Sequence, residues 1–178
     1  MFKGELLENR IVIWNIEESR KLYSSGFYGK PLGVPKPKDA DFDAPLILDL
    51  IEGYYLTEKG KLEVYESRKK VSLRKLKAVC RREYADFDVK YRVYRTLRDA
   101  GLVVTPGIKF GSDFAVYRKG PGLEHAPFII QVYRSSDPLT ATRVVLSGRL
   151  ATTVRKRFVI AVVSPRRVDF LGFEWWRP

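Results

Sequence analysis

The chain has 178 residues, of which 45% are apolar and 30% charged, a balance typical of a folded globular protein. It carries 33 Lys and Arg against 21 Asp and Glu, a formal charge of +12 at pH 7 that favours a polyanionic partner, nucleic acid above all. A single cysteine and a single histidine exclude an internal disulfide and a zinc site built from His and Cys.

Two further features of composition concern the compartment and the source. No apolar run reaches the roughly 18–20 residues that span a bilayer, and the start of the chain lacks the layout of a signal peptide. We therefore expect a soluble, cytoplasmic protein. The labile residues Asn, Gln, Met and Cys number five in all, which is typical of thermophile proteins.

The first part of the chain predicts a strand, an exposed loop and a helix. Residues 10–14 are apolar and suit a short strand. Residues 29–41 contain three prolines and three lysines, so they predict a loop. Residues 44–56 predict a helix in which Pro45 occupies the first helical position.

The middle of the chain predicts a small strand and a basic helix before the boundary between two domains. A turn at residues 59–61 precedes an alternating strand at 62–65, and the charged segment 68–82 has apolar residues at helical spacing. We place the boundary after residue 82. This gives a mixed N-terminal domain at 1–82 and a C-terminal domain at 83–178.

The C-terminal half predicts an α/β domain with a central mixed sheet flanked by helices. Its first helix has aromatic residues on one face from Phe87 to Leu97 and ends before Gly101. A second helical segment begins at the cap signal Asp137-Pro138 and extends to about Lys156. The expected strands are 102–104, 114–118, 127–133, 158–163 and 168–175.

The search for catalytic groups leaves few candidates. The sequence has no Gly-rich phosphate loop, and the acidic pattern of a metal-dependent nuclease, which would begin at Asp113, fails at Gln131. His125 follows a Gly-Pro-Gly loop and precedes an apolar strand, a position where a rigid scaffold can hold an active group. Its imidazole can hold or donate a proton near neutral pH. A surface or structural histidine is the alternative.

Residues 91–156 resemble the catalytic domain of the archaeal tRNA-splicing endonucleases. The similar segments are Tyr91–Gly101, Gly107–Tyr117, His125 and Arg149–Lys156, in the same order and at the same spacing. Residues 28–30 and 52–56 are similar, less specifically, to the N-terminal domain of that family.

The resemblance implies a catalytic triad of Tyr117, His125 and Lys156 and an RNA cleavage that needs no metal or other cofactor. The family cleaves precursor tRNA at bulge–helix–bulge motifs and leaves a 2′,3′-cyclic phosphate and a 5′-hydroxyl. Tyr117 would be the general base or a positioning group, His125 the general acid, and Lys156 the group that stabilises the transition state. A neighbouring cation such as Lys156 would lower the pKa of Tyr117 and help it to accept a proton.

The resemblance also implies residues that bind RNA. Arg149 and Trp175 take the places of two cationic side chains that hold a flipped base, although Trp175 could equally pack at a subunit interface. If residues 148–157 are helical, Arg149 and Lys156 share a face. The loop lysines Lys30, Lys36 and Lys38 either help to grip RNA or form a solvated loop.

The assembly departs from the simplest member of the family. Family members join their dimers through an acidic loop between the last two strands, and here that loop, 164–167, is basic. We therefore expect an α2β2 heterotetramer with a structural subunit that supplies the acidic loop. Two alternatives stay open: a non-catalytic RNA-binding or scaffold subunit of the same assembly, and a basic RNA-binding module that shares only the fold.

Overall fold

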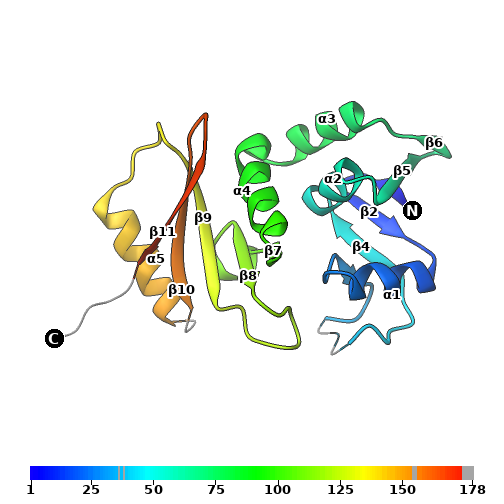
Figure 1. Ribbon diagram of the computed structural model, residues 1–178, viewed down its shortest axis with the longest axis horizontal. Helices are drawn as coiled ribbons and strands as arrows, with labels where there is room; N and C mark the ends of the chain where they lie inside the picture. Colours follow the sequence, from blue (N-terminus) through cyan, green and yellow to red (C-terminus); the bar gives the residue numbers. More distant parts are fainter. Residues whose placement is uncertain (36, 38, 154–155, 174–178) are drawn as a thin grey trace. The chain divides into compact units, whose positions relative to one another are not determined.

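A computed structural model describes residues 1–35, 37, 39–153 and 156–173. The chain divides into two compact units, Met1–Phe87 and Asp88–Pro178 (Figure 1). Each unit contains one β-sheet of its own together with helices, so the expected α/β class with two mixed sheets is confirmed. Among the described residues, no helix is both long enough and apolar enough to cross a bilayer.

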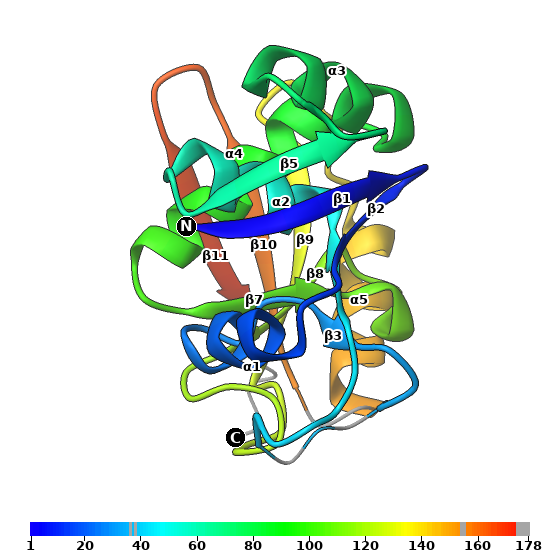
Figure 2. The same ribbon diagram turned by 90° about the vertical axis from the view of Figure 1, so that its right-hand side faces the viewer.

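The N-terminal unit is built on a six-stranded sheet whose strands lie in the order β3-β4-β2-β1-β5-β6. In that sheet β1 pairs with β2 antiparallel and with β5 parallel, and Figure 2 shows β1 and β5 side by side. Its strands are β1 (Phe2–Leu7), β2 (Arg10–Ile13), β3 (Lys30–Pro31), β4 (Leu46–Asp49), β5 (Leu62–Glu66) and β6 (Lys69–Lys70).

The helices of this unit are fixed by polar caps and by buried faces. Asn15 caps α1 (Ile16–Ser24), and Ser72 caps α3 (Leu73–Glu83). Asp49 and Glu52 form a capping box at the start of α2 (Leu50–Glu58). The Asp49 carboxylate accepts the backbone N–H of Glu52, and the Glu52 carboxylate accepts the backbone N–H of Asp49.

The helix expected over residues 44–56 is therefore wrong in its first half. Residues Leu46–Asp49 are β4, which pairs with β2, and the helix begins only after Asp49. Leu46 and Leu48 are fully buried, so sheet pairing and burial override the N-terminal signal of Pro45. The expected helix over 68–82 also begins later, because Lys69–Lys70 form the edge strand β6.

The Pro- and Lys-rich segment at 29–41 behaves largely as the sequence predicts. It contains one two-residue strand, β3, at the edge of the sheet, where a proline is tolerated. Lys30 is exposed in β3. Lys36 and Lys38 lie outside the described residues.

The C-terminal unit is a five-stranded sheet in the order β11-β10-β9-β8-β7, with helices on both faces (Figure 1). The ring of Tyr94 in α4 packs on Phe114, whereas Val144 of α5 packs on the opposite face against Ile129 and Phe158. The elements are α4 (Phe87–Asp99), β7 (Val103–Pro106), η1 (Ile108–Phe110), β8 (Phe114–Tyr117), β9 (Phe128–Arg134), α5 (Ala141–Thr153), β10 (Arg157–Val163) and β11 (Val168–Phe173).

The second helix of this unit differs from its expected bounds at both ends. The Asp137 carboxylate accepts the backbone N–H of Arg134 in a turn, and Thr140 is the residue whose hydroxyl caps α5. The described part of the helix is Ala141–Thr153, and Lys156 is not helical, so it shares no helix face with Arg149. Helix α5 connects the parallel neighbours β9 and β10, which need a crossover of this kind.

Candidate active site

Three strand ends meet at one end of the C-terminal sheet. In the central strand β9, Phe128 pairs with Val116 of β8 on one side and with Arg157 of β10 on the other. Because β8 is antiparallel to β9 and β10 is parallel to it, the end of β8 and the start of β10 both border the start of β9. The last residue of β8 is Tyr117, and the residue that precedes β10 is Lys156.

Tyr117 faces the side of the sheet that α5 covers. Ala115 pairs with Ile129, which belongs to the cluster against Val144 of α5, and Tyr117 lies on the same face as Ala115 because it is two residues further along β8. The phenol is half-buried, and burial raises its pKa above the ordinary value, as does the charge of Glu124, while a hydrogen bond with the Thr105 side chain opposes them. The pKa of Tyr117 is thus shifted in the direction opposite to the lowering that a neighbouring cation would cause.

The loop that carries His125 is held by one carboxylate. Glu124 accepts the backbone N–H groups of Arg118 and Lys119, both at 2.6 Å, directly after Tyr117. Its own N–H donates to the carbonyl of Gly120 and closes the turn. The hydrogen bonds that the Glu124 carboxylate accepts from the backbone, that from Lys119 first, lower its pKa. His125 is the next residue, and its imidazole is exposed.

Lys156 is tied to the other side of that loop. Its Nζ donates to the carbonyl oxygen of Ala126 at 2.7 Å and lies 4.8 Å from the centre of the Phe110 ring. Partial burial lowers the pKa of Lys156, and the nearby ammonium of Lys109 adds to this effect. A cavity of about 640 Å³ opens beside Lys156 and is lined by Arg118, Pro127, Phe128, Thr152 and Arg157.

The three residues of the expected triad thus lie at one end of one sheet. Glu124 joins the strand of Tyr117 to the loop of His125, and Ala126 joins that loop to Lys156. The arrangement offers a phenol, an exposed imidazole and an ammonium beside an open cavity with two arginines. Such a set can transfer protons and stabilise negative charge on a phosphate.

Sequence reasoning missed the residues that support this cluster. No role is assigned to Glu124 from the sequence, and Lys109 and Phe110 enter only as members of the similar segment Gly107–Tyr117. A carboxylate next to a candidate acid, after a Gly-rich loop, is a signal that could have indicated the tether. The contact of Phe110 with Lys156 depends on long-range packing and has no local signal in the sequence.

The remaining expected site residues are spread over the chain. Arg149 is exposed on α5 and Lys30 is exposed on β3. Trp175, like Lys36 and Lys38, lies outside the described residues. Asp113 binds Lys90 at 2.9 Å and accepts hydrogen bonds from Gln131 and from the backbone of Val132, so its oxygens are occupied. Over the described part of the chain, no three His, Cys, Asp or Glu side chains gather as metal ligands would.

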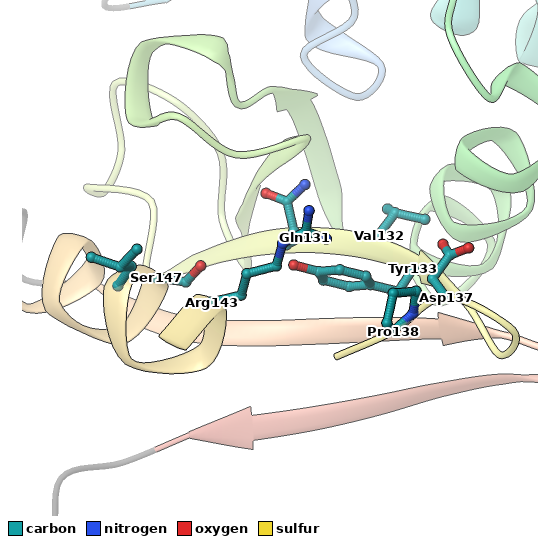
Figure 3. Close-up of a pocket in the computed structure, with 8 residues that line it drawn as sticks. Gln131, Val132, Tyr133, Asp137, Pro138, Arg143 and Ser147 are labelled. Carbon is teal, nitrogen blue, oxygen red and sulfur yellow. The ribbon is translucent and has the colours of Figure 1, made fainter. Parts of the chain in front are cut away.

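A second cavity, of about 650 Å³, lies between β9 and the first turns of α5 (Figure 3). Figure 3 shows Arg143 extending from the helix toward Gln131 of β9, with the ring of Tyr133 beside it. Asp137 and Ser147 complete its polar rim. None of the expected triad lines this cavity.

Comparison with known proteins agrees with the geometry. The family model described as the catalytic C-terminal domain of tRNA intron endonuclease matches residues 87–170, and the model of the N-terminal domain of the same enzyme matches residues 2–77. Together the two matches cover both compact units. The fold and the site therefore define a nucleic-acid-processing enzyme of the endonuclease class.

Relatives match over the full length of the chain. A tRNA-splicing endonuclease of Hyperthermus butylicus is 46% identical over 181 residues, which covers 100% of both chains. A tRNA-splicing endonuclease of Sulfurisphaera tokodaii is 38% identical over 97% of both chains, and one of Saccharolobus islandicus is 41% identical over 98% of both. The chain belongs to the tRNA intron endonuclease family and carries the catalytic domain of that family.

Proposed function

We propose that this chain is the catalytic subunit of a cytoplasmic endonuclease that excises introns from precursor tRNA at bulge–helix–bulge motifs. Cleavage would need no metal ion and would leave a 2′,3′-cyclic phosphate and a 5′-hydroxyl. The observation that carries the proposal is the convergence of Tyr117, His125 and Lys156 at one end of the sheet, tied together through Glu124 and Ala126.

The proposed reaction is a transesterification at one phosphate of the RNA. The 2′-hydroxyl loses its proton and attacks the adjacent phosphorus, and the bond from phosphorus to the 5′-oxygen breaks. His125 is the general acid that gives a proton to the departing 5′-oxygen. Its exposed imidazole, at the end of a tethered loop, is open to a bound phosphate.

Lys156 is the proposed stabiliser of the pentacoordinate phosphorane, which carries more negative charge than the substrate. Its ammonium is held by the Ala126 carbonyl and shielded on one side by Phe110, so it is oriented before RNA binds. A charge in a partly desolvated site acts more strongly on a developing anion than one in water.

Tyr117 is proposed as a positioning group that keeps its own proton. Burial and Glu124 raise the pKa of the phenol, which disfavours the phenolate that a general base would need. A neutral phenol can instead orient the 2′-hydroxyl by a hydrogen bond while the proton leaves to water. Replacing Tyr117 by Phe should therefore slow cleavage and leave the shape of the pH–rate profile unchanged.

RNA binding and assembly complete the proposal. The exposed guanidinium of Arg149 and the indole of Trp175 would hold a base extruded from the bulge, and Lys30, Lys36 and Lys38 would contact the RNA backbone. The turn between β10 and β11 carries the exposed Arg166 and Arg167. A structural subunit with acidic loops would therefore complete an α2β2 heterotetramer.

The test uses a bulge–helix–bulge RNA in excess EDTA, first with the purified chain and then with a structural subunit added. We expect cleavage only in the mixture, with cyclic-phosphate ends. His125→Ala should slow the single-turnover rate at least about 100-fold. Leu123→Ala, in the same loop and also exposed to solvent, is the matched control and should cleave at the wild-type rate.

Each other outcome has a definite meaning. Wild-type cleavage by His125→Ala would remove the general acid from the proposal. Cleavage by the chain alone would overturn the heterotetramer. Bound but uncut RNA in the mixture, with ordered protein, would favour the non-catalytic subunit of the same assembly.

A further inference from the structure

Positive charge in the N-terminal unit is concentrated in one short segment. Residues 68–82 contain eight Lys and Arg and no Asp or Glu, whereas the rest of residues 1–87 contains nine Lys and Arg against fourteen Asp and Glu. Outside this segment the unit therefore carries a net negative charge. We call the exposed cationic side chains of residues 68–82 the α3 patch.

Packing fixes the orientation of the α3 patch. Helix α3 buries Leu76, Val79 and Cys80 and packs against α2. Arg74 and Arg81 lie on its exposed side, seven residues apart, which corresponds to about 10 Å along the helix axis. Cations at this separation can contact more than one phosphate of an RNA strand.

The turn between β5 and β6 adds to the same surface. Glu66 pairs with Lys69 across a two-residue turn in which Ser67 and Arg68 have φ angles of 47° and 66°. Lys75 of α3 forms an ion pair with Glu66, which joins the hairpin to the helix. This ion pair brings the exposed cations of the hairpin next to those of the helix.

Acidic neighbours neutralise only part of this charge. Lys70, Lys75 and Arg82 form ion pairs with Glu63, Glu66 and Glu83, but these three cationic side chains stay 55–68% exposed. Exposed pairs of this kind contribute little energy and can exchange partners. No ion pair is found for Arg68, Lys69 or Arg74 within the part of the chain that the structure describes.

The surface lacks the apolar centre that a protein partner usually needs. Among the large hydrophobic residues of segment 68–82, all of which are described, only Leu73 is exposed, at 37%. Protein interfaces are depleted of charge at their core and enriched in aromatic residues there. A rigid array of cations without such a core is typical of contacts to a phosphate backbone.

We propose that the α3 patch binds the sugar–phosphate backbone of double-stranded RNA and holds the body of a precursor tRNA. This inference deepens the proposed function, on which it rests for the identity of the substrate. The contact reads no base sequence. It gives the N-terminal unit a direct part in substrate binding, separate from the chemistry at Lys156.

The test measures binding of a bulge-free RNA duplex to the full-length chain in EDTA, over a range of salt concentrations. The variant is R68Q/K69Q/R74Q, and the matched control is K3Q/K21Q/K61Q, which removes three exposed lysines from the same unit. We expect the patch variant to bind about tenfold more weakly, with a salt slope reduced by about three. The control should stay near wild type.

Four results would overturn the proposal. They are wild-type affinity in the patch variant, an equal loss in the control, a duplex that does not bind the wild-type chain, and loss of the structural subunit by the patch variant with unchanged RNA affinity. The last result would assign the patch to an acidic protein surface. Because duplex binding requires no cleavage, failure of the proposed catalysis leaves this test intact.

Discussion

Lys156 shows how the environment of one residue shifts the balance between its charged and neutral forms. Its ammonium is partly desolvated and lies near Lys109, and both effects lower its pKa. A lowered pKa means that the native environment disfavours the charged ammonium compared with the unfolded chain, so this charge reduces the free energy of unfolding. The protein accepts this cost at the position where the proposed mechanism uses a positive charge.

Lys156→Gln tests that interpretation. We expect the cleavage rate to fall by about 100-fold or more, because the charge opposite the phosphorane is lost. The melting temperature should not fall measurably, because the variant no longer holds a partly buried charge. Single-turnover kinetics and calorimetry measure the two effects, and a large loss of stability with little loss of rate would contradict the proposed role.

Glu124 is a positioning residue in this view, since its carboxylate touches the backbone of Arg118 and Lys119 and not the reacting atoms. Glu124→Ala should lower kcat by about 10- to 100-fold with little change in KM, because it releases His125 from its place. Both N–H groups donate to the same carboxylate oxygen, so Glu124→Gln, which keeps one oxygen as an acceptor, should recover part of the rate. A change confined to KM would assign Glu124 to substrate binding.

At the scale of the residue, the sequence predicts which residues form the candidate site better than it predicts what surrounds them. Similarity of motif was sufficient to select Tyr117, His125 and Lys156 as candidates. The direction of the Tyr117 pKa could not be predicted, since it depends on burial against strands distant in sequence. The partner of Lys156, the carbonyl of Ala126, is thirty residues away and has no sequence signature.

At the scale of the element, the turn between β7 and β8 supports the site. Gly107 begins this turn, which carries η1 and so the ring of Phe110 against Lys156. A Cβ at Gly107 would lie 2.7 Å from the backbone nitrogen of Phe114 and equally close to the carbonyl oxygen of Ser112. Neither backbone atom can move without disturbing the start of β8.

Gly107→Ala should therefore destabilise the protein by about 1–3 kcal/mol and reduce cleavage. Gly172→Ala is the matched control, because a Cβ at Gly172 in β11 meets no atom of the described residues within 4 Å. Denaturant unfolding and cleavage assays on both variants check the expectation. Equal stability of the two would mean that the turn adjusts freely.

Elements were predictable where local pattern and tertiary packing agree. The aromatic stripe of α4 and the apolar strands β9 and β10 were predicted close to their observed positions. Prediction was wrong where they disagree: the residues of β4 carry a helix-start signal but are held by pairing with β2. The start of α5 was misplaced because Asp137 serves a turn and leaves the cap to Thr140.

At the scale of the whole molecule, buried groups make stability depend on alkaline pH. Burial raises the pKa of the Cys80 thiol to about 12, and it raises that of Tyr84, which donates to Asp49. The pKa of the Cys80 thiol is higher in the native state than in the unfolded chain, so the protonated thiol favours folding. This contribution to the free energy of unfolding is complete at neutral pH, and it is lost above about pH 8.5, where the thiol of the unfolded chain ionises.

Cys80→Ala isolates the contribution of the thiol. Its cavity should cost a free energy that does not vary with pH, whereas wild type should lose about 2 kcal/mol more than the variant between pH 8 and pH 10.5. Urea unfolding at the two pH values measures this difference. Parallel losses in both proteins would show that the thiol is not the group responsible.

The crossover from β9 through α5 to β10 has a consequence for how the protein is made. Synthesis proceeds from the N-terminus, and Lys156 can reach Ala126 only after α5 has formed and β10 has docked beside β9. A chain still emerging from the ribosome therefore has Tyr117 and His125 but lacks the third member of the cluster. A nuclease made among ribosomal and transfer RNA would remain harmless until its last strands are released.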